Sequence, residues 1–202
     1  MFARVGLADR FNWIVKQCAD KRVLDVGACG VRKEYVGNPH LWVHAAIAEV
    51  ASGAVGIDIS GEMVEYIRRR GYDVRVGDAE DFDLNETFDV VHAGSLIEHL
   101  SNPGRFLDCA REHLDNGGRL VLTTPNGQHP RSWLFGHSSP GHLQLYNLDI
   151  LERLLRRHGF RIVERRYLDV MPNPTLKGSL YTAFLHLLPQ FSIALGVAAG
   201  RK

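Results

Sequence analysis

The chain has 202 residues, of which 45% are hydrophobic and 23% are charged, as expected of a globular domain with a substantial core. Its net charge of +1 excludes a global field that would recruit nucleic acid or an anionic membrane. Three cysteines without a CxxC pair argue against a thiolate zinc site and favour a reducing, cytoplasmic compartment. We also expect no signal peptide and no integral membrane segment, because no uninterrupted apolar run is long enough.

Strand-like and helix-like segments alternate along the chain. We expect strands over 22–27, 54–60, 72–78, 88–94, 118–126, 161–170 and 193–202, and helices over 9–19, 41–51, 61–70, 103–113 and 148–159. This alternation predicts a doubly wound α/β domain with a mostly parallel sheet and helices on both faces. No crossover helix is obvious between the last two strands, so an antiparallel closing strand is expected.

The sequence contains no internal repeat and no low-complexity linker, which predicts one domain over residues 1–202. Two segments stand apart from the regular elements. Residues 126–142 are rich in Gly, Pro, Ser and His, and this stretch is long for a strand-to-helix connection. Residues 172–189 form the second unusual segment. We interpret both as candidate lids over a substrate site.

A glycine turn follows the first main strand in the stretch "VLDVGACG". Ligands of doubly wound sheets bind at the carboxyl ends of the strands, and glycines let the backbone approach a ligand closely. Gly27, Ala28 and Gly30 are therefore candidate binding residues. Asp25 would repel a phosphate, so it indicates a ligand with an ammonium or a sulfonium group, unless it only braces the turn.

Two further carboxylates end the next two predicted strands. Asp58, with Ile59 beside it, can accept both hydroxyl groups of a ribose. Asp78, with Ala79, can accept a hydrogen bond from the amino group of a purine. Together with Asp25, these positions match an amino-acid-like group, a ribose and an adenine. S-adenosylmethionine (SAM) contains all three and carries no phosphate.

Five segments in order resemble the successive motifs of class I SAM-dependent methyltransferases: "VLDVGACG", "VGIDIS", "GDAEDF", "FDVVHAGSLIEHL" and "GGRLVLTTPN". Residues 141–160 resemble the branch of small-molecule O-methyltransferases that includes the quinone-biosynthesis enzymes. The resemblance covers roughly residues 22–160. It implies a Rossmann-like fold, SAM as the cofactor, and methyl transfer to a small molecule, with a hydroxyl oxygen as the favoured acceptor.

The chain departs from this family in two places. The family loop usually reads G-x-G-x-G, whereas here Cys29 and Val31 follow Gly27 at those positions and Gly30 is displaced. The quinone-type enzymes tend to carry a further glutamate where Ser95 stands. These departures keep open an alternative in which the domain is a non-catalytic SAM-binding sensor or scaffold.

Methyl transfer to a hydroxyl group benefits from a base, and histidine suits this task. Gly94 and Ser95 follow the fourth main strand and should pass near the methionine part of the cofactor. His99 is the first candidate for the base, with Glu98 orienting it or holding a substrate donor. His142, at the end of the 126–142 segment, is the second candidate. Glu98 as a helix cap and His99 as a solvent-facing residue remain the structural alternatives.

We expect no metal. His40 and His44 have a spacing that can hold one, but no third ligand is evident. A nicotinamide-dependent oxidoreductase is disfavoured because G-x-G-x-x-G and a Tyr-x-x-x-Lys pair are both missing. Nucleic-acid methylation is disfavoured because no N/D-P-P-Y tetrapeptide is present.

Overall fold

The structure is a computed structural model that describes residues 7–130, 141–169, 185 and 187–202. Its strands are β1 (Leu7–Asp9), β2 (Arg22–Val26), β3 (Gly53–Asp58), β4 (Val74–Val76), β5 (Phe88–Gly94), β6 (Leu114–Pro125), β7 (Phe160–Asp169) and β8 (Ala194–Arg201). Its α-helices are α1 (Arg10–Cys18), α2 (Val43–Val50), α3 (Gly61–Arg68), α4 (Pro103–Glu112) and α6 (Leu148–Arg157). Short 3-10 helices are η1 (Lys33–Tyr35), η2 (Ile97–His99) and η3 (Pro189–Phe191).

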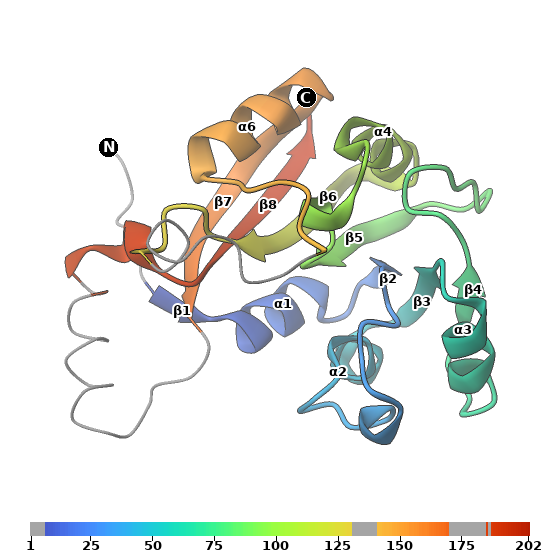
Figure 1. The fold of residues 1–202 in the computed structure, drawn as a ribbon. Coiled ribbons are helices and arrows are strands. Elements are labelled where there is room, and N and C mark those ends of the chain that lie inside the picture. Colours follow the sequence, from blue (N-terminus) through green and yellow to red (C-terminus); the bar gives the residue numbers. More distant parts are fainter. Residues whose placement is uncertain (1–6, 131–140, 170–184, 186) are drawn as a thin grey trace, which may run out of the picture.

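The described strands form one eight-stranded sheet in the order β1-β7-β8-β6-β5-β2-β3-β4. Every neighbouring pair is parallel except the two pairs that β8 makes with β6 and β7. The predicted mostly parallel sheet with an antiparallel closing strand is therefore confirmed (Figure 1). The sequence did not predict β1, a three-residue strand that pairs with β7 at the edge of the sheet.

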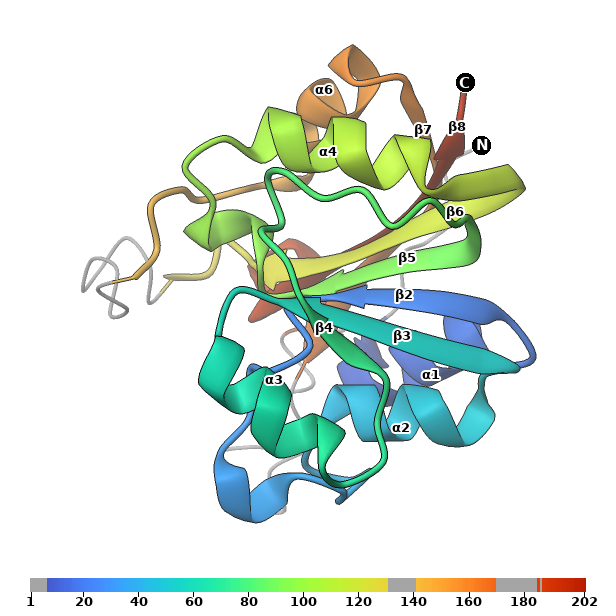
Figure 2. The same cartoon turned by 90° about the vertical axis from the view of Figure 1, so that its right-hand side faces the viewer.

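Helices cover both faces of the sheet, with α1, α2 and α3 on one side and α4 and α6 on the other (Figure 2). Consecutive side chains of β2 pack on opposite faces of the sheet, because side chains alternate along a strand. Val23 packs in the cluster that contains α1 and α2 residues. Leu24 packs in the larger cluster with residues of α4 and α6. This two-sided burial explains the nearly continuous apolar runs of the central strands.

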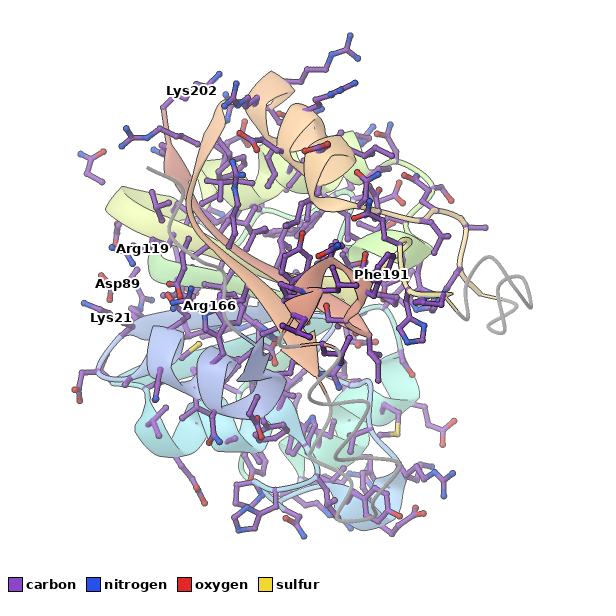
Figure 3. All side chains as sticks on the ribbon, turned by 90° about the vertical axis from the view of Figure 1, so that its left-hand side faces the viewer. Lys21, Asp89, Arg119, Arg166, Phe191 and Lys202 are labelled. Carbon is purple, nitrogen blue, oxygen red and sulfur yellow. The ribbon has the colours of Figure 1, made fainter. Side chains whose placement is uncertain are left out.

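The strand order reverses between β2 and β5. From β2 the chain builds outward through β3 and β4, and then crosses back to place β5 on the other side of β2. A crevice is expected beyond the carboxyl ends of such strands. Figure 3 shows the two ends of the sheet, with Lys21, Asp89 and Arg119 at one end and Phe191 at the other.

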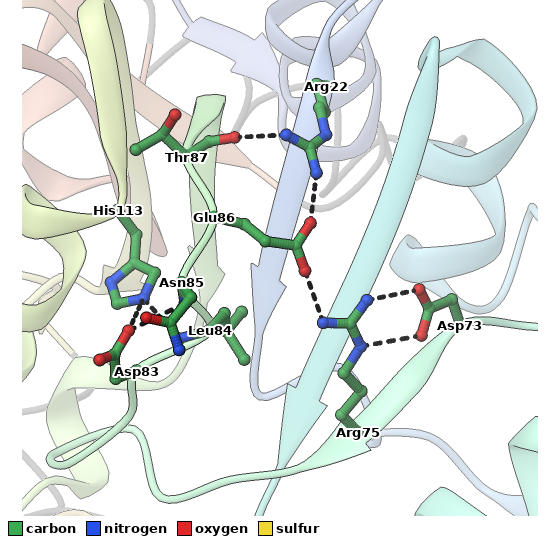
Figure 4. A network of polar contacts seen from close by, with 9 residues as sticks. All are labelled: Arg22, Asp73, Arg75, Asp83, Leu84, Asn85, Glu86, Thr87 and His113. Carbon is green, nitrogen blue, oxygen red and sulfur yellow. Dashed lines mark hydrogen bonds and ion pairs between the residues drawn. The ribbon is translucent and has the colours of Figure 1, made fainter.

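A network of ion pairs closes the amino-terminal end of the sheet, away from this crevice (Figure 4). Glu86, in the connection to β5, pairs with Arg22 on β2 and, at 2.7 Å, with Arg75 on β4. Arg75 also pairs with Asp73 at 2.9 Å. These side chains are partly exposed, so we expect each pair to stabilise the fold only modestly.

Parts of both candidate lids lie outside the described residues, namely residues 131–140 of the first segment and residues 172–184 and 186 of the second. Among the residues that are described, no helix combines the length and the apolar character needed to cross a bilayer.

We predict that Gly196→Ala destabilises the fold by about 1–3 kcal/mol, because added core atoms force neighbours to move. A Cβ on Gly196 would lie 2.8 Å from Leu168 Cδ1 and 2.9 Å from Trp13 Cζ3. Gly53→Ala is the control, since no atom lies within 4 Å of its added Cβ. Chemical denaturation of both variants tests this, and equal stabilities would contradict the packing described for β8.

Candidate active site

The glycine turn after β2 is tied to the end of β3. Gly27 has a φ of +82°, a conformation that favours glycine. The backbone N–H groups of Gly27 and Ala28 both donate to the carbonyl oxygen of Ile57, at 2.8 and 3.1 Å. These bonds fix the turn at the carboxyl edge of the sheet without using any side chain.

The Asp58 carboxylate reinforces the same turn. Its Oδ2 accepts a hydrogen bond from the Cys29 N–H at 2.9 Å, and its Oδ1 accepts one from the Ser60 N–H at 2.9 Å. Each carboxylate oxygen retains acceptor capacity for a further donor. Asp58 therefore orders the turn and still has acceptor capacity for the hydroxyl groups of a sugar.

Beside Asp58 lies a cavity of about 390 Å³, here called the outer cavity. The sequence-predicted residues in its wall are Gly27, Asp58, Ile59, Asp78, Ala79 and His99. Ile59 is 73% exposed, so it offers an apolar surface at the rim. The Oδ1 of Asp78 accepts a hydrogen bond from the Glu80 N–H at 2.9 Å, which orients this carboxylate. The two carboxylates, Asp58 and Asp78, can accept hydrogen bonds from the hydroxyl and amino groups of an adenosine that carries no phosphate.

A second cavity, of about 210 Å³, lies on the side of the turn that faces α1 and α2, and is here called the inner cavity. The sequence-predicted residues in its wall are Asp25, Gly27, Ala28, Gly30, Gly94 and Ser95. Gly27 lines both cavities, so they adjoin at the turn. Ser95 has a φ of +51°, a strained conformation of the kind that clusters at functional sites.

Asp25 is buried between two histidines. Its Oδ2 lies 3.0 Å from Nδ1 of His44 on α2, and its Oδ1 lies 2.7 Å from Nδ1 of His92 on β5. Burial opposes ionisation of the Asp25 carboxyl, but electrostatic attraction and hydrogen bonds from His92 and His44 outweigh it and hold its pKa well below the usual range. The carboxylate therefore stays ionised and acts only as an acceptor.

The predicted catalytic residues gather after β5. Glu98, His99 and His142 each offer one ligand atom within 4.8 Å of the others, and the rings of His99 and His142 meet edge to face at 4.8 Å. His99 Nδ1 lies 2.8 Å from the Gly141 carbonyl oxygen. This contact makes Nδ1 the donor and leaves Nε2 as the basic nitrogen of the neutral ring.

Glu98 lies close to His99 and His142 and is fully buried. Its Oε2 accepts a hydrogen bond from Thr124 Oγ1 at 3.0 Å, and its Oε1 has no partner among the described residues. Burial raises the pKa of this carboxyl, against the opposing effects of its hydrogen bonds and of nearby positive charge. One carboxylate and two imidazoles could share a proton, and they are also ligand types that divalent metals accept.

Neither buried thiol is suited to act as a nucleophile. Burial, together with the charges of Asp58 and Asp25, raises the pKa of Cys29 to about 12. Burial, with a smaller effect of Asp25, raises that of Cys18 to about 12. Both thiols therefore stay protonated at neutral pH, and thiolate chemistry is disfavoured.

Sequence reasoning missed several side chains in the wall of the inner cavity, namely Arg10, Trp42, His44, His92 and Thr123. His92 could have been found, because it precedes Gly94 by two residues on the same strand and therefore shares its face. Arg10 and His44 reach the cavity only through the packing of α1 and α2. His44 was considered only together with His40, which precedes α2.

Comparison with known proteins places these features in one family. The model of a family described as "Methyltransferase domain" matches residues 4–165. A Mycolicibacterium smegmatis protein named "Probable S-adenosylmethionine-dependent methyltransferase" is 28% identical over 78% of this chain and 62% of its own length. "Ubiquinone biosynthesis O-methyltransferase" of Xanthomonas oryzae pv. oryzae is 29% identical over 54% of this chain and 44% of its own length. The chain thus spans less than two thirds of either relative.

Solved structures show the same fold at low sequence identity. A SAM-dependent methyltransferase from Mesorhizobium loti superposes with a TM-score of 0.64 at 19% identity, over 95% of both chains. Magnesium protoporphyrin IX methyltransferase of Synechocystis PCC 6803, determined with bound S-adenosylhomocysteine, superposes with a TM-score of 0.61 at 17% identity, over 95% of this chain and 80% of that one.

The chain thus has the Rossmann-like fold of these solved methyltransferases. It belongs to the methyltransferase domain family, whose cofactor is SAM.

We predict that Asp58→Ala weakens the binding of S-adenosylhomocysteine roughly tenfold or more, since hydrogen bonds to a charged group are worth about 1.5–3 kcal/mol each. Calorimetric titration measures the affinity, and circular dichroism checks the fold. Glu65→Ala, which alters an exposed carboxylate on α3, is the control. Unchanged affinity in Asp58→Ala would contradict its assignment to the ribose.

We predict that Asp25→Asn destabilises the fold at pH 7 by about 3–5 kcal/mol, because breaking a buried charged network leaves groups unpaired. The native pKa of Asp25 is lowered, so its stabilisation is present above the unfolded value of about 3.9 and is lost as the pH falls below it. The gap between wild type and variant should therefore narrow below about pH 4, by up to about 1.4 kcal/mol per pH unit.

Denaturation curves between pH 7 and pH 3 measure this gap. Glu49→Gln, which removes an exposed carboxylate of α2, is the control and should show no comparable gap. A gap for Asp25→Asn that stays constant with pH would mean that the Asp25 carboxylate is not held ionised by its two histidines.

Proposed function

We propose that this chain transfers a methyl group from SAM to a hydroxyl oxygen of a small molecule. The observation that carries the proposal is the position of His99. Its ring lines the same cavity as Asp58 and Asp78, and Gly141 holds it as the tautomer with a basic Nε2. The name of the Xanthomonas relative, an O-methyltransferase of ubiquinone biosynthesis, supports oxygen as the acceptor atom.

SAM supplies a methyl group on a sulfonium sulfur, which an acceptor oxygen takes by in-line displacement, leaving S-adenosylhomocysteine. The chain itself has to bind and align the reactants, and good alignment alone is worth roughly 7–11 kcal/mol. Asp58 and Asp78 would hold the ribose and the adenine in the outer cavity. The part of the cofactor that extends toward the inner cavity would lie against Gly27, Gly94 and Ser95.

His99 Nε2 would take the proton that the acceptor hydroxyl loses as its oxygen bonds to the methyl carbon. General base catalysis of this kind contributes about 10²–10⁴-fold. Glu98 lies close to His99, and its negative charge would stabilise the imidazolium that forms. Thr124 orients Glu98 through the hydrogen bond to Oε2. His142, whose ring touches that of His99, is the second candidate for the base.

We further propose that residues 1–202 form one catalytic domain that works in the cytoplasm. Support for one domain comes from a single sheet that contains strands from Leu7 to Arg201. Support for the compartment comes from the three cysteines, which are all free. A sensor or scaffold would bind the cofactor without consuming it, so formation of S-adenosylhomocysteine separates an enzyme from these alternatives.

We predict that His99→Ala lowers the rate of S-adenosylhomocysteine formation about 10²–10⁴-fold and changes cofactor affinity much less. Turnover with a panel of phenolic and aliphatic alcohols, and titration with S-adenosylhomocysteine, measure the two quantities. His158→Ala is the control, because His158 bonds to Asp108 outside the crevice.

Normal turnover in His99→Ala would mean that His142 is the base or that the reaction uses no base. The wild-type assay is repeated with a metal chelator, because Glu98, His99 and His142 also offer metal-ligand atoms. Loss of turnover on chelation would make His99 a ligand rather than a base.

A further inference from the structure

Three buried polar atoms on residues that line the inner cavity, His44 Nε2, His92 Nε2 and Thr123 Oγ1, lack a hydrogen-bond partner among the described residues, and two of them lie close together. Within the described residues, no hydrogen bond satisfies His92 Nε2 or Thr123 Oγ1, although their residues are only 2% and 1% exposed. Both residues line the inner cavity. A Cβ placed on Gly94 would lie 3.2 Å from His92 Nε2 and 3.5 Å from Thr123 Oγ1, so the two atoms converge above this glycine. Leaving such groups unsatisfied is costly.

The Asp25 carboxylate determines which ring nitrogen of His92 acts as the donor and which as the acceptor. The ionised carboxylate can only accept. In the neutral form of the His92 ring, which is the form that the inference uses, the proton therefore lies on Nδ1, which faces Asp25 Oδ1 at 2.7 Å. Nε2 then carries the lone pair and is an acceptor. The hydroxyl of Thr123 can also accept. The convergence point therefore presents two acceptors backed by a buried negative charge, which is an environment for a cationic donor.

A positively charged side chain of α1 also lines this cavity. Arg10 lines the inner cavity, and its Nη1 lies 3.4 Å from Ser95 Oγ. A guanidinium is a strong partner for a carboxylate. Acceptors backed by Asp25 and a guanidinium from Arg10 together complement the two charged groups of an α-amino acid.

We propose that His92 Nε2 and Thr123 Oγ1 bind the α-ammonium group of the methionine part of the cofactor, with Asp25 as the positioning residue that fixes the His92 tautomer. Asp25 thus acts on the ammonium through an imidazole, because its carboxylate is only 3% exposed and faces the two histidines, whereas the acceptor without a partner is His92 Nε2. The inference rests on the proposed function, and it assigns binding roles to two residues that sequence reasoning did not single out.

The test compares three probes by calorimetry. S-adenosylhomocysteine carries the amino group, S-(5′-deoxyadenosyl)-4-thiobutyrate lacks only that group, and 5′-methylthioadenosine lacks the whole amino-acid end. In the wild type, S-adenosylhomocysteine should bind more tightly than the deamino probe. His92→Leu should lower its affinity roughly tenfold to a hundredfold, and should change the affinities of the other two probes by less than about twofold.

Equal losses of affinity for all three probes in His92→Leu would overturn the inference, because they would indicate that His92 has a structural role only. Unchanged affinity for S-adenosylhomocysteine would overturn it as well, because water alone would then satisfy the two atoms. Failure of the wild type to bind any of the probes would overturn both this inference and the proposed function. Binding of all three with equal affinity would overturn the inference alone.

Thr123→Val provides a second, nearly isosteric variant in case His92→Leu does not fold. It should lower the affinity for S-adenosylhomocysteine several-fold, in keeping with the loss of one acceptor, and leave the deamino probe unchanged. Thr87→Val is the control, because Thr87 is exposed and its hydroxyl bonds to Asp115, away from both cavities. An equal effect of both valine variants on S-adenosylhomocysteine binding would also overturn the inference.

Discussion

The buried carboxylate of Asp25 is the constraint on which the crevice depends. It lies at the point where the strand order reverses, and it joins β2 to α2 through His44 and to β5 through His92. A buried negative charge is costly unless it is paired and hydrogen-bonded. Both histidines must therefore stay in place whenever the domain is folded, and the carboxyl ends of β2 and β5 stay aligned as a result.

In the proposed function, the two cavities that meet at Gly27 would each bind a different part of one elongated ligand. The outer cavity offers exposed or half-buried carboxylates that suit neutral hydroxyl and amino groups. The inner cavity offers the buried negative charge of Asp25 and the partly buried positive charge of Arg10. Such a division would account for a turn that lacks phosphate-binding chemistry, although its position resembles that of a dinucleotide-binding turn. It also places His99 in the outer cavity, near the proposed path of the cofactor.

Local patterns in the sequence were sufficient to predict most strands of the sheet and several residues in the wall of the outer cavity. Asp58 and Asp78 follow apolar strands, and parallel strands bring their carboxyl ends to one edge. The pairing of His99 with Gly141 could not be predicted, because it joins segments 42 residues apart through a loop contact. The short strand β1 was missed for a similar reason, since three residues carry no periodic pattern and β1 gains its order from β7.

The sequence by itself determined the fold class, the reversal of the last strand and the acidic residues at the strand ends, because alternation and strand length encode these locally. Only the tertiary structure decided how those residues are used. It turned Asp25 from a direct ligand candidate into the partner of two histidines, and it brought Arg10 and Thr123 to the same cavity. The physical reason is that helix packing and strand pairing join residues far apart in the chain, and such contacts leave no periodic mark in a single sequence.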